Sequence, residues 1–258
     1  VVGGGLEGIE ALGEVLRRFR GCRQIRVELV EASARLLPEG PAAVDSALRR
    51  HVETMPVTVH TSARVAKVTP RSVVLASGRR LRSDLTIWTG GARPAALLLA
   101  SGLAESSQTW SPVQPTLFSR AYDNVLVAGD AAAFPTPLPK QAYHAIDMGR
   151  CAASNVLRRL QGKSAQQFQP SPKPMLLAFG DIDTYLVSGA RVIASPLLAA
   201  AKEAVFQATM LGLDPPHGLG AIGRLQERGG SGLARLFAVG DEPWTDLART
   251  LSVRIDAS

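Results

Sequence analysis

The chain has few of the side chains that build redox or metal centres. Its 258 residues include two cysteines, Cys22 and Cys151, and four histidines. The cysteines lie far apart and form no C-x-x-C pair, which argues against a dithiol redox centre and against a structural zinc site. No cluster of histidine and cysteine has the spacing of metal ligands, so we expect no metal. Two unpaired thiols in a reducing compartment are the simplest interpretation.

Long apolar runs and runs of basic residues are also missing. No stretch of about 18 uncharged apolar residues occurs, so we expect no membrane-spanning helix, and no secretory signal is visible. The net charge is +7, but Lys and Arg are scattered as single residues and pairs. Scattered basic residues are typical of a solvated surface, and attraction to anionic lipid or nucleotide phosphate is the functional alternative. Without a helix-turn-helix or an aromatic-rich sheet motif, we expect no nucleic-acid partner.

The most informative segment is the glycine-rich stretch at the start of the chain. Gly3, Gly5 and Gly8 fit the pattern G-x-G-x-x-G. In this pattern the first glycine permits a tight turn, the second lets the backbone approach a pyrophosphate, and the third lets helix and strand pack closely. The phosphates are then held at a helix N-terminus, where free N–H groups and the dipole favour anions. The alternative is a tight turn without a ligand.

The context of this turn favours a dinucleotide. Residues 9–20 have helical periodicity and residues 26–31 (RVELVE) form a strand, which together predict a parallel βαβ unit. Glu31 follows the glycines by roughly 20 residues, the spacing of an acid that binds a ribose 2′-hydroxyl. A carboxylate there would repel a 2′-phosphate, so NAD(H) is favoured over NADP(H), although the nearby Arg35 weakens that preference. A surface acid is the alternative for Glu31.

The rest of the chain predicts an α/β fold. The composition, 46% apolar with 24 glycines and 17 prolines, suits one large domain or two small ones. From residue 57 the apolar period changes to two, which predicts a small antiparallel meander of the strands VTVH, RVAKV, SVVLAS and LTIW. The further elements that we expect are a helix over 42–51, a turn-rich crossover over 89–94, a buried strand over 124–128, a helix over 141–160, two or three strands over 175–193 and an apolar helix over 197–213.

Four segments in order resemble the pyridine-nucleotide-disulfide oxidoreductase superfamily in its FAD-dependent form with two dinucleotide sites. VVGGGLEGIEALGEV resembles the NAD-binding loop and helix, VELVEASARLLP the strand that follows, SDLTIWTGGARP the crossover, and NVLVAGDAAA the second flavin motif. The resemblance covers residues 1 to about 160. It implies an NAD(H)-binding domain over 1–90 that is Rossmann-like with an antiparallel meander, the C-terminal part of an FAD-binding domain over 91–165, and an α+β region over 175–258. The family's first flavin-binding part is not in the sequence, so we expect an N-terminally truncated chain.

The resemblance also assigns roles to individual residues. Gly3, Gly5 and Gly8 would hold the NAD pyrophosphate and Glu31 the adenosine ribose. Gly91 would lie near the nucleotides, and Gly129 with Asp130 would contact the flavin ribityl chain or its pyrophosphate. Glu10 matches a family acid near the contact of nicotinamide and flavin, where it would be catalytic. An exposed helix acid is the equal alternative for Glu10.

The C-terminal region resembles the membrane-associated type II NADH dehydrogenases more than the disulfide reductases. KPMLLAFGDIDTYLVSG and the apolar helix after it are similar to their terminal strands and membrane-facing helix. A core or dimer helix is the alternative. The family's quinone-side segment, Ala-Gln-x-Ala-x-Gln-Gln-Gly, has Tyr143 and Asp147 here where glutamines are expected. This departure puts quinone in doubt as the acceptor, and His144 beside it could relay protons or simply be packed.

Together these observations predict an FAD-dependent NAD(P)H dehydrogenase that transfers a hydride from NADH to the flavin and then electrons to a quinone or another acceptor. The alternatives are a truncated fragment that binds NAD(H) without turnover, and a flavoprotein similar to apoptosis-inducing factor or ferredoxin reductase. The expected location is the cytoplasm, with peripheral contact to the inner face of the membrane and a homodimer as further possibilities.

Overall fold

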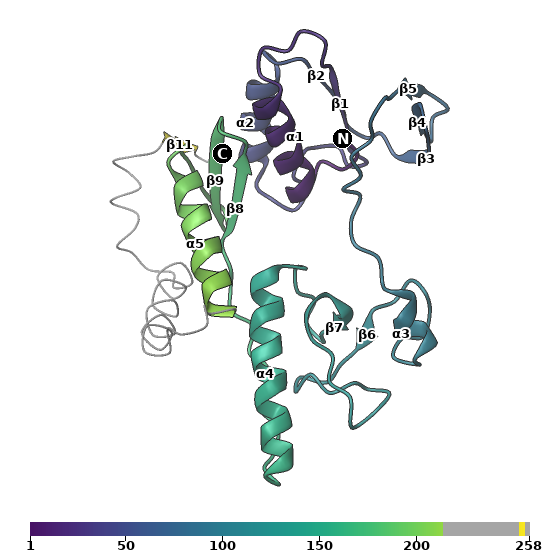
Figure 1. Ribbon diagram of the computed structural model, residues 1–258, viewed down its shortest axis with the longest axis vertical. Helices are drawn as coiled ribbons and strands as arrows, with labels where there is room; N and C mark the ends of the chain where they lie inside the picture. The colour runs from purple at the N-terminus through teal and green to yellow at the C-terminus, as the bar shows by residue number, and fades with distance from the viewer. Residues whose placement is uncertain (214–252, 256–258) are drawn as a thin grey trace. The chain divides into compact units, whose positions relative to one another are not determined.

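The computed structural model of the protein describes residues 1–213 and 253–255 (Figure 1). The chain divides into two compact units. Unit 1 joins Val1–Gly91 with Pro174–Ser258, and unit 2 consists of Ala92–Lys173. The C-terminal region therefore belongs to the same unit as the glycine-rich turn.

The first part of unit 1 is a parallel βαβ arrangement. Val2 forms parallel bridges with Val30 on one side and Trp88 on the other, so the strand before the glycine turn lies between two neighbours. The expectation that residues 57–60 belong to the antiparallel meander is wrong, because they pair in parallel with the strand at residues 27–30. A helix connects these two strands, and such a crossover returns the chain in the same direction. The elements are α1 (Leu6–Arg18), β1 (Val27–Val30), α2 (Ala42–Val52) and β2 (Val57–His60).

A three-stranded antiparallel meander follows, as the alternating pattern predicts. Val73 and Leu75 are buried on one side of it together with Leu81. Residues 85–88, expected as a fourth strand, instead approach the N-terminal strand, where the Ile87 carbonyl accepts a hydrogen bond from the Val2 N–H at 2.9 Å. The strands are β3 (Val65–Thr69), β4 (Ser72–Leu75) and β5 (Arg80–Arg82).

The C-terminal part of unit 1 contains an antiparallel sheet in the order β11–β10–β9–β8 and the helix α5. Figure 1 shows β8 alongside α1. Ile9 and Leu12 of α1 are fully buried in the same core as Phe179 and Tyr185 of this sheet. Gly13 permits this packing, since a Cβ there would lie 2.3 Å from the Gly180 nitrogen. The elements are β8 (Met175–Phe179), β9 (Asp183–Ser188), β10 (Arg191–Ala194), α5 (Leu198–Leu213) and β11 (Val253–Ile255).

Unit 2 has little regular sheet. The strand expected over 124–128 does not form. Of these five residues only Leu126 forms a β-bridge, with Phe118. The helix expected over 141–160 is present and packs its buried Met148 against Val113, Leu117 and other apolar residues of this unit. The elements are α3 (Ala96–Ala100), β6 (Ser111–Pro112), the 3-10 turn η1 (Gly129–Ala131), β7 (Ala132–Ala133) and α4 (Ala142–Leu160).

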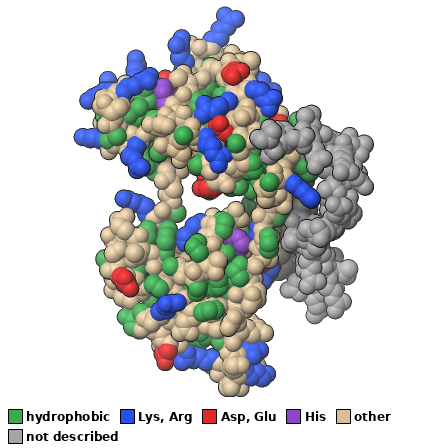
Figure 2. Space-filling view, turned by 180° about the vertical axis from the view of Figure 1, so that it is seen from behind, with side chains coloured by type: hydrophobic (Ala, Val, Ile, Leu, Met, Phe, Trp, Pro, Cys, Tyr) green, Lys and Arg blue, Asp and Glu red, His purple; other side chains and the backbone are tan. Residues whose placement is uncertain are grey.

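Figure 2 shows Lys and Arg spread over one face of the described residues, with acidic side chains among them. No helix within residues 1–213 is long and apolar enough to cross a bilayer. In the described part of the chain, no three His, Cys, Asp or Glu side chains gather in a way that would hold a metal ion.

Candidate functional site

The glycine turn has the geometry that the three-glycine pattern predicts. Gly3 has a φ of +107°, and a Cβ there would lie 2.6 Å from the Thr89 carbonyl oxygen. A Cβ on Gly8 would lie 1.9 Å from the Gly3 carbonyl oxygen, so only glycine lets the helix start this close to the turn. At Gly5, by contrast, no atom lies within 4 Å of an added Cβ. Gly3 and Gly8 therefore close the turn, and Gly5 leaves open space in front of the helix.

The open space at Gly5 lies at the N-terminus of α1. Gly5 is the N-cap residue of this helix, in an extended conformation and without a side-chain cap. The first N–H groups of an α-helix have no acceptor within the helix and, with the helix dipole, favour an anion. The backbone at Gly5 can therefore approach a phosphate group closely.

The Glu31 carboxylate is hydrogen-bonded to the glycine turn. Glu31 is 7% exposed, and its two oxygens accept hydrogen bonds from the backbone N–H groups of Gly4 and Ser33, each at 2.6 Å. Burial alone would raise the pKa of this carboxyl group, but the hydrogen bonds from Ser33 and Gly4 outweigh it and hold the pKa below its usual value. Glu31 is therefore an anion whose position is fixed relative to the glycine turn.

Arg35, which weakened the expected preference for NAD(H), is already engaged in its own loop. Its guanidinium donates to the Gly40 carbonyl at 2.7 Å and to the Pro38 carbonyl at 2.6 Å. Both terminal nitrogens of the side chain thus hold the 35–40 loop together. This arrangement makes Arg35 a poor ligand for a 2′-phosphate and strengthens the interpretation of Glu31.

A depression of about 430 Å³ lies in unit 1 beyond the carboxyl end of β2. It is next to Glu31, whose carbonyl accepts a hydrogen bond from the Ala63 N–H at 2.9 Å. Ligands of open α/β sheets bind outside the carboxyl ends of the parallel strands. The residues that line the depression are Val59, His60, Thr61, Ser62, Ala63, Arg64, Leu75, Ala76, Ser77 and Arg79.

Glu10, on α1, faces the C-terminal part of unit 1. Its carboxylate accepts a hydrogen bond from the Ala178 N–H of β8 at 3.0 Å and forms an ion pair with Lys202 of α5. The two charged side chains are 30% and 33% exposed. Glu10 therefore connects α1 to both α5 and β8, and contact between Glu10 and a nicotinamide stays a prediction.

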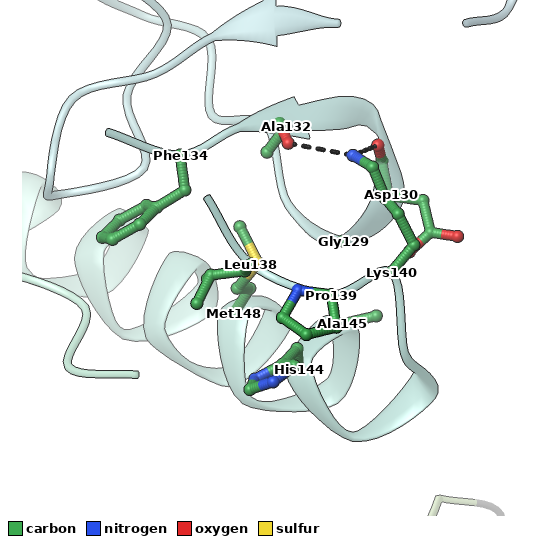
Figure 3. Close-up of a pocket in the computed structure, with 10 residues that line it drawn as sticks. All are labelled: Gly129, Asp130, Ala132, Phe134, Leu138, Pro139, Lys140, His144, Ala145 and Met148. Carbon is green, nitrogen blue, oxygen red and sulfur yellow. Dashed lines mark hydrogen bonds between the residues drawn. The ribbon is translucent and has the colours of Figure 1, made fainter. Parts of the chain in front are cut away.

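In unit 2, Gly129 and Asp130 form the tight turn η1 before α4. Gly129 has a φ of +67°, and a Cβ on it would lie 3.1 Å from the Ala145 Cβ of α4. Asp130 is exposed. Between this turn and α4 lies a cavity of about 20 Å³, room for little more than one water molecule (Figure 3). Gly91, at the end of unit 1, has a φ of +94° and open space around its Cα.

His144 lines this cavity from α4. The side chain is buried, and its Nδ1 has no hydrogen-bond partner within the described residues. Burial lowers the pKa of His144, the Lys173 cation lowers it further, and Asp147 opposes both. A neutral, packed imidazole is the state that this environment favours.

The two residues that depart from the quinone-side segment have different surroundings. Asp147 pairs with Lys173 at 2.8 Å, with Arg150 more distant at 3.8 Å. Tyr143 is 37% exposed. The carboxylate that replaces a glutamine is thus part of an ion pair within unit 2.

Three residues of these sites were not anticipated as site residues. Thr89 donates a hydrogen bond to the Val2 carbonyl at 2.9 Å and lies against both Gly3 and Gly8. Lys202 forms an ion pair with Glu10, and Lys140 donates a hydrogen bond to the Asp130 carbonyl. A lysine within the apolar helix at 197–213 was a visible signal for Lys202, whereas nothing in the local pattern singled out Lys140.

Comparison with known proteins agrees with this geometry. The family described as pyridine nucleotide-disulphide oxidoreductase matches residues 1–149. This match covers more than half of the chain, and the chain belongs to that family. The expected family resemblance is confirmed.

The curated relatives include type II NADH:quinone oxidoreductases. The protein of Haemophilus influenzae is 24% identical over 196 residues, which are 70% of this chain and 44% of that protein. The protein of Staphylococcus epidermidis is 27% identical over 246 residues, 89% of this chain and 59% of that protein. The chain thus spans about half the length of these relatives.

Solved structures share the fold. NDH2 from Plasmodium falciparum in complex with NADH matches with a TM-score of 0.67 at 13% identity, over 81% of this chain and 61% of that one. An NAD-dependent persulfide reductase from A. fulgidus matches with a TM-score of 0.56 at 20% identity, over 73% of this chain and 35% of that one. These similarities confirm the expected α/β, Rossmann-like fold class.

Proposed function

We propose that the chain carries the NADH-binding part of an FAD-dependent NADH dehydrogenase. One observation supports this proposal above the others: an open glycine turn at a helix N-terminus next to a buried, ionised Glu31 held at 2.6 Å from the Gly4 nitrogen. Gly3, Gly5 and Gly8 would hold the pyrophosphate and Glu31 the adenosine ribose. The depression beyond β2 offers room for the adenine ring.

The flavin would be FAD, with Gly129 and Asp130 contacting its ribityl chain or pyrophosphate and Gly91 near the nucleotides. Gly129, with its positive φ, forms a turn that leaves the Asp130 carboxylate exposed. An exposed carboxylate can accept hydrogen bonds from a ligand that is rich in hydroxyl groups. When bound, FAD supplies the hydride acceptor and the electron carrier of the reaction. The residues of this chain bind and orient the two nucleotides, and Glu10 is the candidate catalytic side chain.

Quinone is the acceptor that the named activity of the relatives suggests. The exposed apolar side chains of α5, with Phe206 52% and Leu213 53% exposed, support peripheral contact with a membrane where a quinone would dissolve. No residue of α5 is buried, which disfavours the alternative of a core helix. Tyr143 and Asp147 support a second possibility, an acceptor other than quinone, because they replace the glutamines of the quinone-side segment.

The test of this function is turnover by the chain supplied with FAD. Flavin absorbance that stays with the purified chain after gel filtration, together with NADH oxidation when a soluble quinone is added, would support the dehydrogenase. A chain that binds NADH but retains no flavin would contradict the dehydrogenase for these 258 residues and support the NAD(H)-binding alternative. NADH oxidation with ferricyanide but not with quinone would favour the second acceptor class.

A further inference from the structure

Lys140 makes three contacts at the turn that carries Asp130, of which Figure 3 shows the two hydrogen bonds. Its ammonium group donates to the Asp130 carbonyl, and to the Ala132 carbonyl at 3.3 Å. The same group lies 4.0 Å from the centre of the Trp110 ring, in a cation–π contact. One side chain thus holds two backbone oxygens of the Gly129–Ala132 turn and the indole beside it.

The backbone end of the Lys140 side chain is fixed independently of the turn. Lys140 directly precedes Gln141, the N-cap of α4, and the helix continues for 19 residues. The side chain therefore reaches back from the rigid start of a long helix to the turn. The turn itself is short and has no side-chain cap, and after it β7 pairs with β6.

We propose that Lys140 is a positioning residue for the flavin site, which holds the Gly129–Ala132 turn in the conformation that presents the Asp130 carboxylate to the ribityl hydroxyl groups of FAD. The inference rests on the proposed function, in which Asp130 contacts FAD. Two charge-assisted hydrogen bonds to carbonyl groups are among the stronger contacts that a side chain can give a backbone turn. The cation also lies close enough to Asp130 to interact with its charge.

The first test uses hydrogen exchange of the chain without FAD. The variants are Lys140→Met, which removes the donor, and Lys140→Arg, which keeps the charge. The control is Lys163→Met, at an exposed lysine beyond the other end of α4, about 28 Å away along the helix. We expect amide exchange of residues 128–133 to be about tenfold faster in Lys140→Met than in the wild type, with Lys140→Arg and the control close to the wild type. Equal exchange in all four proteins would overturn the proposal.

The second test measures FAD affinity by quenching of flavin fluorescence. We expect the dissociation constant to rise about tenfold in Lys140→Met and to recover largely in Lys140→Arg. An unchanged affinity in Lys140→Met would overturn the link between Lys140 and FAD. If the wild-type chain binds no FAD, the proposed flavin site fails, and the exchange measurement still decides whether Lys140 holds the turn.

A pH series separates the charge from the packing of the side chain. Burial lowers the pKa of Lys140 from its usual 10.5, and Asp130 partly opposes this shift. The protonated form makes the hydrogen bonds, so FAD affinity should fall as the pH rises toward 10. In Lys140→Arg the guanidinium stays charged, and the fall should move to higher pH. The same alkaline profile in both proteins would contradict a role for the Lys140 cation.

Discussion

The Glu31 carboxylate accepts a hydrogen bond from the backbone N–H of Gly4 at 2.6 Å. This contact joins the acid at the end of β1 to the middle of the glycine turn, 27 positions away in the sequence. The chain therefore holds the proposed ribose-binding acid and the proposed phosphate-binding turn in one fixed arrangement. Pre-organisation of this kind lowers the entropy lost when a dinucleotide binds.

Gly5 and Gly8 form a matched pair for testing the turn. Gly8→Ala should destabilise the chain by about 2 kcal/mol or more, because its Cβ would overlap the Gly3 carbonyl oxygen. Gly5→Ala should stay within about 1 kcal/mol of the wild type, because its Cβ meets open space. We nevertheless expect it to weaken NADH binding at least about tenfold. Urea unfolding and NADH titration measure the two effects, and full NADH affinity in a folded Gly5→Ala protein would contradict the phosphate site.

Glu31 should make the stability of the chain sensitive to acid. Its pKa is lowered in the folded state, so its contribution is fully present above the usual value of 4.5 and is lost as the pH falls through the folded pKa. Glu31→Gln should therefore lower the free energy of unfolding at pH 7 and flatten its dependence on pH between about 5 and 3. The exposed Glu39 offers a control in Glu39→Gln. Parallel stability curves for the wild type and Glu31→Gln would show that the carboxylate is not held as described.

The sequence predicted the glycine turn and the βαβ unit around it because their determinants are local. Gly3, Gly5 and Gly8 act through their own backbone, and the spacing to Glu31 follows from one βαβ unit. The expectation was wrong at residues 57–60, because alternation cannot say which strand will be the neighbour, and at residues 124–128, where only Leu126 forms a bridge. Lys202 was visible as a charge within an apolar helix, but its partner Glu10 is set by tertiary packing, as is the contact of Lys140 with the Asp130 carbonyl.

The ion pair of Glu10 with Lys202 should couple α1 to α5. A double-mutant cycle with Glu10→Gln and Lys202→Met should give a coupling free energy of about 1 kcal/mol, since both side chains are about one third exposed. Glu10→Gln keeps an oxygen that can accept the Ala178 N–H, so this substitution removes the charge and leaves that acceptor in place. Urea unfolding at low and high salt measures the coupling, which should weaken with salt. Additive effects of the two substitutions would contradict the pair.

His144 should act as a packed side chain rather than a proton relay. His144→Leu should leave the unfolding midpoint at pH 7 unchanged or raise it, because it removes a buried Nδ1 without a described partner. The lowered pKa of His144 means that stability is lost as the pH falls below its usual value of 6.5. The variant should therefore be less sensitive to pH between 7 and 5. A variant that folds normally but loses electron transfer to the acceptor would instead favour the relay.

The central claim is that unit 1 binds NADH and that Glu31 makes it prefer NADH to NADPH. Calorimetric titration of the chain with NADH and with NADPH tests this claim most directly. We expect one NADH per chain, bound at least about tenfold more tightly than NADPH. Glu31→Gln should narrow that difference by weakening the affinity for NADH. A folded wild-type chain that binds neither nucleotide, or binds both equally, would contradict the account.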